Sequence, residues 1–460
     1  MSNSPMSIIP RRRLLRLFAS LALPLAVAAC GGGGSSEDPP PPPASCSVAD
    51  QKAWLTSYMD DWYFWYRLSP RPDPAPYATV ASYFDAVLYT GTSASFPADR
   101  WSYFQSTESF NRFFGEGATL GYGVAVTGIE SAGDAARPLW VRYVEPGSPA
   151  AAGGVQRGDQ ILAINGSAVS TVIASDDYSA LTASRAGDQL TLLLRRAGVD
   201  RTVVLTAAEF NLAPVQAAAV QTTAGGRKMG YLQVKDMISQ ALPALETAFE
   251  QFKAAGVQDL VLDLRYNGGG LVSTGGTLAS YIAGTRGSGL AYASLLYNDK
   301  RAAASNERFA FSRLNASLGL PRVYVLTGPR TCSASEQVIN GLRGAGVEVV
   351  TVGETTCGKP VGFLPSSSCG QTYSVVNFES VNDRNEGSYF DGFDAVCPVA
   401  ENFTVSQGSP ADPLLAAAQR LAEGGRCLQA GADGRAQPLT LRRNVPRKVE
   451  AGERQDMIGR

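Results

Sequence analysis

The stretch "RVYVLTGPRTCSASEQVINGL" (322–342) reads as a strand followed directly by a helix, with a serine at the junction. Ser333 and Glu336 are three residues apart, which fits a capping box in which both side chains bond backbone N–H groups at the helix start. A catalytic serine often occupies the same place, but it needs a group that accepts its proton. The stretch alone therefore leaves two interpretations open, a helix cap and a nucleophile, and the cap is the commoner one.

Strand and helix alternate on both sides of this stretch, over residues 209–430. Strand-like "MGYLQV" and "VQDLVLDL" precede it, each followed by a helix-like segment, and "VEVVTVG" follows it as another strand. The run "VQDLVLDL" is almost continuously apolar, which is typical of a strand buried on both faces. This alternation predicts a layered α/β domain.

A proton acceptor for Ser333 has to be found without histidine, because the 460 residues contain none. Arginine stays protonated in proteins, and only seven of the 40 basic residues are lysine. One of them, Lys359, stands in "VTVGETTCGKPVG", a strand followed by a glycine-bounded loop. Burial can lower the pKa of a lysine by several units, so Lys359 is the candidate base.

A third candidate element is "DLRYNGGG" (263–270), where a buried strand enters a glycine turn. Glycine lets the backbone approach a ligand closely, and such a turn can direct N–H groups at an oxyanion. The alternative is a plain connection between a strand and a helix.

Residues 117–208 consist of short β-rich runs separated by glycine. Within them "VEPGSPAAAGGVQRGDQILAING" (144–166) predicts a short helix, a turn, a strand and another turn, and this order closely resembles a PDZ domain. PDZ domains bind peptides by adding a strand to a sheet edge. The resemblance implies that backbone N–H groups of the "GYGV" loop bind a peptide's terminal carboxylate. That loop comprises Gly121, Tyr122, Gly123 and Val124. The alternative is a structural β-module without a ligand.

Three segments, "DLRYNGGG", "CSASE" and "GETTCGK", resemble in this order the signature segments of the carboxyl-terminal processing peptidases, also called tail-specific proteases. A PDZ domain upstream of them is that family's arrangement, and the resemblance covers roughly residues 117–425. It implies a multidomain α+β protein with a ClpP/crotonase-like ββα core. It also implies a Ser333–Lys359 dyad, with the N–H groups of Gly269 and Ala334 as oxyanion donors.

One position departs from this family. Many members carry glutamine four residues after the lysine, where it orients the amine, but this chain has Phe363. Another group must hold Lys359, or the dyad acts alone. Cys332 and Cys357 flank the two dyad residues; a disulfide between them would brace the site, and the alternative is that each pairs elsewhere.

Residues 1–29 are expected to be a lipoprotein signal peptide. They contain a basic start, an apolar stretch too short for a convincing membrane span, and "VAAC", which resembles a bacterial lipobox with Cys30 as the lipidated residue. The alternative is an ordinary secretory signal that leaves Cys30 as a free thiol. Residues 30–45 form a Gly- and Pro-rich tether. We therefore expect a periplasm-facing protein of the bacterial cell envelope, and Gly31 favours the outer membrane.

Six cysteines remain when Cys30 is set aside, and an even number in an exported chain indicates disulfides. Six cysteines allow 15 pairings, which the sequence does not resolve. With no histidine and no Cys-x-x-Cys, neither a zinc site nor another cofactor is expected. The six are Cys46, Cys332, Cys357, Cys369, Cys397 and Cys427.

The two ends of the body of the chain are less informative. Residues 46–116 are rich in helical and aromatic patterns, which indicates the core of a small helical unit or, alternatively, a binding surface. Residues 431–460 show little periodicity and are predicted to be disordered. A net charge of −1 without a basic stripe argues against a nucleic-acid partner.

The function that these patterns predict is an envelope-anchored serine endopeptidase that recognises protein or peptide C-terminal tails through its PDZ domain. The alternative is a catalytically inactive peptide-binding lipoprotein of the same fold. A penicillin-binding or β-lactamase type would need Ser-x-x-Lys, and no lysine has serine three residues before it. An α/β-hydrolase would need histidine.

Overall fold

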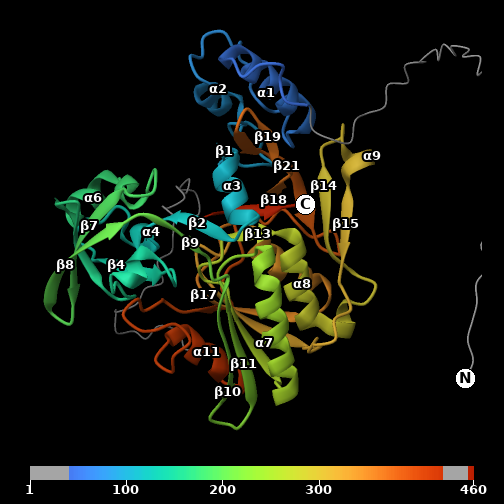
Figure 1. Cartoon of the computed structure of the whole chain (residues 1–460). Coiled ribbons are helices and arrows are strands. Elements are labelled where there is room, and N and C mark those ends of the chain that lie inside the picture. The colour runs from blue at the N-terminus through green and yellow to red at the C-terminus, as the bar shows by residue number, and fades with distance from the viewer. Residues whose placement is uncertain (1–40, 428–453, 460) are drawn as a thin grey trace, which may run out of the picture. The chain divides into compact units, whose positions relative to one another are not determined.

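The computed structural model describes residues 41–427 and 454–459 (Figure 1). The predicted signal peptide, Cys30 and residues 31–40 of the tether lie outside this range. Within it, no helix combines the length and the apolar character needed to cross a membrane.

The N-terminal region is mainly helical, as predicted, but it includes one strand. That strand, β1, pairs antiparallel with β20 of a later hairpin, so the helical prediction is wrong for residues 103–106. Two aromatic side chains of α1 pack on residues far along the chain: the ring of Trp54 lies 5.2 Å from that of Tyr373, and Trp62 packs edge-on against Tyr297. The aromatic residues therefore contribute to a shared core. The elements are α1 (Val48–Trp62), α2 (Val80–Val87), β1 (Tyr103–Ser106) and α3 (Thr107–Phe114), with β19 (Ser366–Ser368) and β20 (Gln371–Ser374).

The β-rich region forms an antiparallel sheet with its own apolar core. The strands follow the order β3-β4-β5-β7-β8, which leaves β3 at one edge, and β6 pairs with β5. Leu139, Ile161 and Leu192 are among its fully buried residues. Its elements are β3 (Val124–Val126), α4 (Gly128–Ser131), β4 (Leu139–Val144), α5 (Pro149–Ala152), β5 (Gln160–Ile164), β6 (Ser167–Ala168), α6 (Val169–Ser175), β7 (Gln189–Arg196) and β8 (Val199–Thr206). A separate pair, β2 (Ala118–Gly121) with β9 (Ala208–Asn211), encloses this region in sequence.

The first large sheet has the order β10-β11-β12-β16-β17-β22, and its strands from β11 to β22 are parallel. Alternate residues face opposite cores: Val261 and Tyr324 belong to one, and Leu262 and Val325 to the other. Helix α11 covers the first face, and α7, α8 and α10 cover the second, which explains the nearly continuous apolar strands. The strands are β10 (Val215–Thr222), β11 (Lys228–Val234), β12 (Asp259–Asp263), β16 (Arg322–Thr327), β17 (Glu348–Gly353) and β22 (Cys397–Pro398). The helices are α7 (Leu242–Ala255), α8 (Val272–Ala283), α10 (Ala334–Gly344) and α11 (Pro413–Ala422).

A second large sheet packs against α8 and α10, with the order β13-β23-β18-β21-β14-β15. Tyr292 and Phe378 of this sheet are buried in the same core as Leu278 and Val338 of the two helices. The resulting layers are α11, a sheet, a set of helices and a second sheet, and the predicted multidomain α+β class is confirmed. The elements are β13 (Gly269–Leu271), β14 (Ala291–Tyr297), α9 (Ala302–Ser305), β15 (Glu307–Ala310), β18 (Val361–Phe363), β21 (Val376–Val381) and β23 (Asp456–Ile458).

Strand β23 corrects one prediction, because residues 454–459 are ordered although residues 431–460 were expected to be disordered. A segment this short shows no periodicity in the sequence. Its order comes from tertiary contacts, since it lies between β13 and β18 and both Met457 and Ile458 are buried.

All six cysteines of the described part of the chain are paired, as predicted for an exported protein. The pairs are Cys46–Cys369, Cys332–Cys357 and Cys397–Cys427. The second pair is the one considered as a brace for the site.

Candidate active site

Three neighbouring parallel strands bring the three sequence motifs together. β12, β16 and β17 lie side by side in register, with Val261 opposite Tyr324 and Tyr324 opposite Val350. The carboxyl ends of parallel strands meet at the same edge of a sheet, which is where ligands bind in open α/β sheets. The loops that leave this edge carry "NGGG", "CSAS" and "TTCGK" in turn.

Ser333 does not have the geometry of an ordinary helix cap. Its backbone has φ 60° and ψ −118°, whereas an N-cap residue has extended backbone. A non-glycine residue in such a sparsely populated region costs about 1–3 kcal/mol, and such strain is concentrated at functional sites. Its Oγ is buried and makes no hydrogen bond within the described residues. The glutamate half of the predicted capping box is formed, since Glu336 accepts a hydrogen bond from the Ser333 N–H.

The buried carboxylate of Glu336 connects the serine loop to the lysine loop. It accepts hydrogen bonds from Ser333 N (2.9 Å), Thr356 Oγ1 (2.5 Å), Gly358 N (2.8 Å) and Lys359 N (2.8 Å). Burial raises the pKa of Glu336, and these hydrogen bonds oppose that rise. The sequence predicted the bond to Ser333 from the three-residue spacing, but it carried no signal for the contacts beyond residue 350.

Lys359 is fully buried, and burial lowers its pKa to about 7. The negative charges of Asp456, Asp99 and Glu336 act in the opposite direction. The amine Nζ lies 3.7 Å from the centroid of the Phe363 ring. Phe363 therefore packs directly against the amine from the position where the family usually has glutamine.

The amine also donates a hydrogen bond to the backbone oxygen of Gln455. Ser333 Oγ has no hydrogen bond to Lys359 in this arrangement. The structure thus brings the two loops together through Glu336, while the amine is engaged by a third segment of the chain.

The two predicted oxyanion donors differ in the hydrogen bonding of their N–H groups. Ala334 is the first residue of α10, and the first N–H groups of a helix have no partner within the helix. The Gly269 N–H donates to Asn267 Oδ1 at 2.9 Å, so its role as a donor stays a prediction that requires this bond to open. Gly269 does lie against the serine: a β-carbon built on it would stand 2.9 Å from both Ala334 N and Ser333 Cβ.

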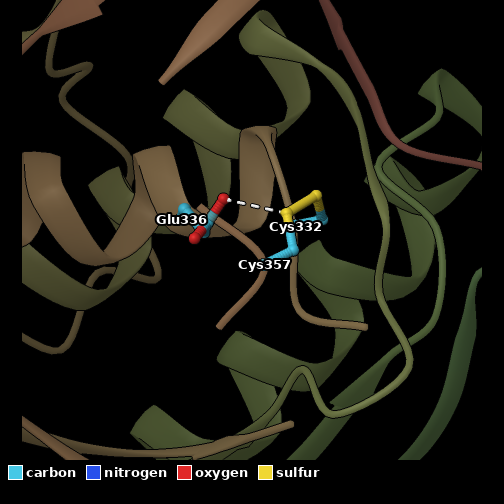
Figure 2. A group of neighbouring side chains, drawn as sticks. All are labelled: Cys332, Glu336 and Cys357. Atoms are coloured by element: carbon cyan, nitrogen blue, oxygen red, sulfur yellow. Dashed lines mark hydrogen bonds between the residues drawn. A yellow bond between two sulfur atoms is a disulfide. The ribbon is translucent and has the colours of Figure 1, made fainter. Parts of the chain in front are cut away.

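The disulfide Cys332–Cys357 joins the two loops covalently beside Glu336 (Figure 2). Cys357 Sγ lies 3.4 Å from a Glu336 oxygen, and the three side chains form a compact group (Figure 2). Cysteine binds metals as a thiolate, and neither sulfur is a thiolate while the two are bonded to each other. This group therefore braces the site.

The predicted carboxylate-binding loop lies in the β-rich region. Gly121 ends β2, Tyr122 and Gly123 form the turn, and Val124 begins the edge strand β3. Gly123 has φ 76°, and the backbone oxygen of Tyr122 accepts a hydrogen bond from Ala150 N of α5 at 2.9 Å. The loop is thus anchored beside an edge strand.

Two ion-pair contacts connect this region to the loops of the candidate site. Glu130 of α4 pairs with Arg330, three residues before Ser333. Arg157 pairs with Glu401 at 2.8 Å, and Glu401 also accepts from Tyr266 Oη of the glycine-turn loop at 2.6 Å. No sequence pattern indicated these contacts, because each joins residues more than 100 positions apart.

Comparison with known proteins identifies three parts of the chain. The profile of peptidase family S41 matches residues 228–373, that of the PDZ domain residues 140–196, and that of the peptidase S41 N-terminal domain residues 50–103. The last match covers most of the N-terminal helical region.

Two curated relatives are named carboxyl-terminal-processing protease. The protein from Picosynechococcus is 28% identical over 242 residues, which cover 51% of this chain and 55% of the relative. The protein from Synechocystis is 30% identical over 239 residues, covering 51% and 53%. The chain thus spans about half the length of these relatives.

Among solved structures, a putative S41 protease from Bacteroides fragilis superimposes with a TM-score of 0.64 at 25% identity. The match covers 81% of this chain and 97% of that one. The resemblance inferred from three short motifs is confirmed: the chain belongs to peptidase family S41 and carries that family's N-terminal domain and a PDZ domain.

Proposed function

We propose that this protein is a serine endopeptidase that uses Ser333 as the nucleophile and Lys359 as the base. The observation that carries the proposal is a lysine buried within a loop that Glu336 ties to a strained serine. Desolvation makes the neutral amine accessible near pH 7, where a lysine in water is protonated. An inactive member of the fold would have no need of this arrangement.

The reaction follows from these positions. The neutral Lys359 amine takes the proton of Ser333 Oγ as the oxygen attacks the carbonyl carbon of the scissile peptide bond. The oxyanion that forms faces the start of α10, where the Ala334 N–H and the helix dipole favour negative charge. The Lys359 ammonium then gives its proton to the departing amine, and water hydrolyses the acyl-enzyme by the same two proton transfers in reverse order.

The PDZ domain is proposed to select substrates by their C-terminal tails. Its strand β3 lies at a sheet edge, and a peptide could extend the sheet there by main-chain hydrogen bonds. The peptide's terminal carboxylate would then meet the N–H groups of Gly121, Tyr122, Gly123 and Val124.

The cellular location of the protein is proposed from its sequence. Lipidation of Cys30 would anchor the protein in the cell envelope, facing the periplasm, and Gly31 after it favours the outer membrane. The Gly- and Pro-rich tether would then hold the peptidase away from the membrane surface.

We predict that Ser333→Ala abolishes cleavage of a peptide substrate and labelling by a serine-reactive probe. Its stability should change little, because the Ser333 hydroxyl makes no hydrogen bond in the described structure.

Lys359→Arg should be nearly as inactive as Ser333→Ala, since arginine keeps its proton. Lys253→Arg on the surface of α7 serves as the control. Cleavage by the unmodified protein should rise with pH through about 7, as Lys359 loses its proton. Near-normal turnover by Lys359→Arg would exclude it as the base.

We predict that Glu336→Gln lowers activity by at least about tenfold through misplacement of the dyad. Each carboxylate oxygen accepts a backbone N–H, so the amide group must face one of these donors whichever way it turns. An unsatisfied buried donor costs about 1–3 kcal/mol of stability. Loss of the carboxylate charge should also move the pH midpoint of activity downward, because that charge raises the pKa of Lys359.

The control for this variant is Glu348→Gln, which changes an exposed carboxylate of β17. It should alter neither the rate nor the pH midpoint. An unchanged pH midpoint in Glu336→Gln would mean that Glu336 supports the fold without acting on the dyad.

We predict that a substrate with a free C-terminal carboxylate is cleaved faster than the same peptide with an amidated end. The comparison isolates the carboxylate, because the two peptides are otherwise identical. Equal rates would assign the PDZ domain another role.

We predict that Cys30→Ser moves the full-length protein from the membrane fraction to the soluble fraction of the cell. Fractionation followed by immunoblotting provides the measurement. Retention of the variant in the membrane would exclude lipidation of Cys30 as the anchor.

A further inference from the structure

Residues 454–459 form a strand between β13 and β18, close to Ser333 and Lys359, and we call the space that it occupies the groove. β23 pairs in parallel with β13, where Asp456 lies opposite Gly269, and with β18, where Ile458 lies opposite Phe363. Asp456 N donates to Gly268 O at 3.1 Å, and Gly459 N donates to Phe363 O at 3.0 Å. The segment is therefore held by backbone hydrogen bonds on both sides, which would hold any extended peptide.

Glycines line both sides of this groove, and because they have no side chain they leave space for the segment. A β-carbon built on Gly268 would stand 1.5 Å from the Arg454 oxygen, and one on Gly269 would stand 2.1 Å from the Asp456 oxygen. On the opposite side, a β-carbon on Gly362 would stand 2.6 Å from the Met457 oxygen. The glycines of the "NGGG" turn thus do more than allow its backbone conformation. They also leave space for a polypeptide backbone at the candidate active site.

The segment also places carbonyl groups at the reacting atoms. The Gln455 oxygen accepts the hydrogen bond from Lys359 Nζ. The Asp456 oxygen lies 2.1 Å from the β-carbon position of Gly269, and Ala334 N and Ser333 Cβ each lie 2.9 Å from that same point. The Asp456 carbonyl, Ser333 and the start of α10 therefore all lie close to Gly269.

Side chains of the segment fit their surroundings as well. Met457 and Ile458 are buried, and Gln337 Nε2 of α10 lies 3.5 Å from Met457 Sδ. Asp456 accepts a hydrogen bond from Tyr103 Oη at 2.7 Å, and the Arg454 guanidinium lies 4.1 Å from the Phe113 ring centroid. The N-terminal domain thus contributes to holding the segment in the groove.

We propose that residues 454–459 act as an intramolecular inhibitor that fills the substrate groove and engages Lys359, so that a substrate must displace this segment before it can be cleaved. This inference rests on the proposed function, because it takes the groove beside the dyad to be the substrate groove. It also identifies the form of substrate that the groove accepts, an extended strand with apolar side chains at two successive positions.

A binding experiment tests the groove without requiring activity. Two full-length proteins carry Ser333→Ala together with either Met457→Asp or the matched control Met457→Leu. A charge at a buried position weakens docking of the segment, whereas leucine conserves its volume. The probe is a fluorescent peptide with the sequence RQDMIG, that of residues 454–459.

Measured by fluorescence anisotropy, the probe should bind the Met457→Asp protein at least about tenfold more tightly than the Met457→Leu protein. The reason is that the apparent affinity is lower when a smaller fraction of the grooves is free. Ile458→Asp should reproduce this gain independently. Equal binding to the aspartate and leucine variants, or binding to neither, would overturn the inference.

A second experiment uses the same substitutions with Ser333 intact. Met457→Asp should increase the rates of peptide cleavage and probe labelling at least about fivefold over Met457→Leu, since more of the grooves are free. Equal rates in two active variants would overturn the inference. Mass spectrometry would show whether the active protein loses residues 457–460 while Ser333→Ala keeps them. Such a loss would mean that the segment is a substrate, and it would also overturn the inference. If the binding experiment succeeds and no variant cleaves or labels, the proposed function fails while the occupied groove stands.

Discussion

The carboxylate of Glu336 is the group on which the geometry of the site depends. A buried carboxylate is costly unless hydrogen bonds satisfy it, and charge-assisted bonds to backbone N–H groups do so most effectively. Its donors come from two loops that follow different strands, so the carboxylate is satisfied only when both loops are in place. The need to satisfy one charge therefore fixes the start of α10 relative to Lys359.

In the proposed mechanism lysine takes the place of histidine, and the difference lies in the environment of the side chain. A histidine is poised near neutral pH in water, whereas Lys359 reaches that range because the protein removes it from water. This places a demand on the surroundings of the amine: they must be apolar yet leave a path to the serine. The Phe363 ring meets the demand on one side, and its face still attracts a protonated amine, so both charge states have a suitable neighbour.

Much of this arrangement could be predicted from local patterns. Strands such as "VQDLVLDL" are buried on both faces and therefore read as apolar runs, and the order of motifs along parallel strands places them at one edge of a sheet. The contact of Phe363 with Lys359 could not be predicted, since it depends on the direction that a residue of β18 faces. Nor could β23, because residues 456–458 are ordered by partners nearly 100 or more positions away. The bond between Gly269 and Asn267 likewise depends on a loop conformation that glycine leaves undetermined in the sequence.

The disulfide between Cys332 and Cys357 closes a ring of chain that includes α10 and β17. Ser333 lies just inside one end of this ring, and Lys359 lies just outside the other. A peptidase is exposed to cleavage by other peptidases and by other copies of itself. A single cut anywhere between the two cysteines would leave both ends covalently joined beside the dyad. The ring thus keeps Ser333 and Lys359, the proposed nucleophile and base, together after a nick in the helix and strand that connect them.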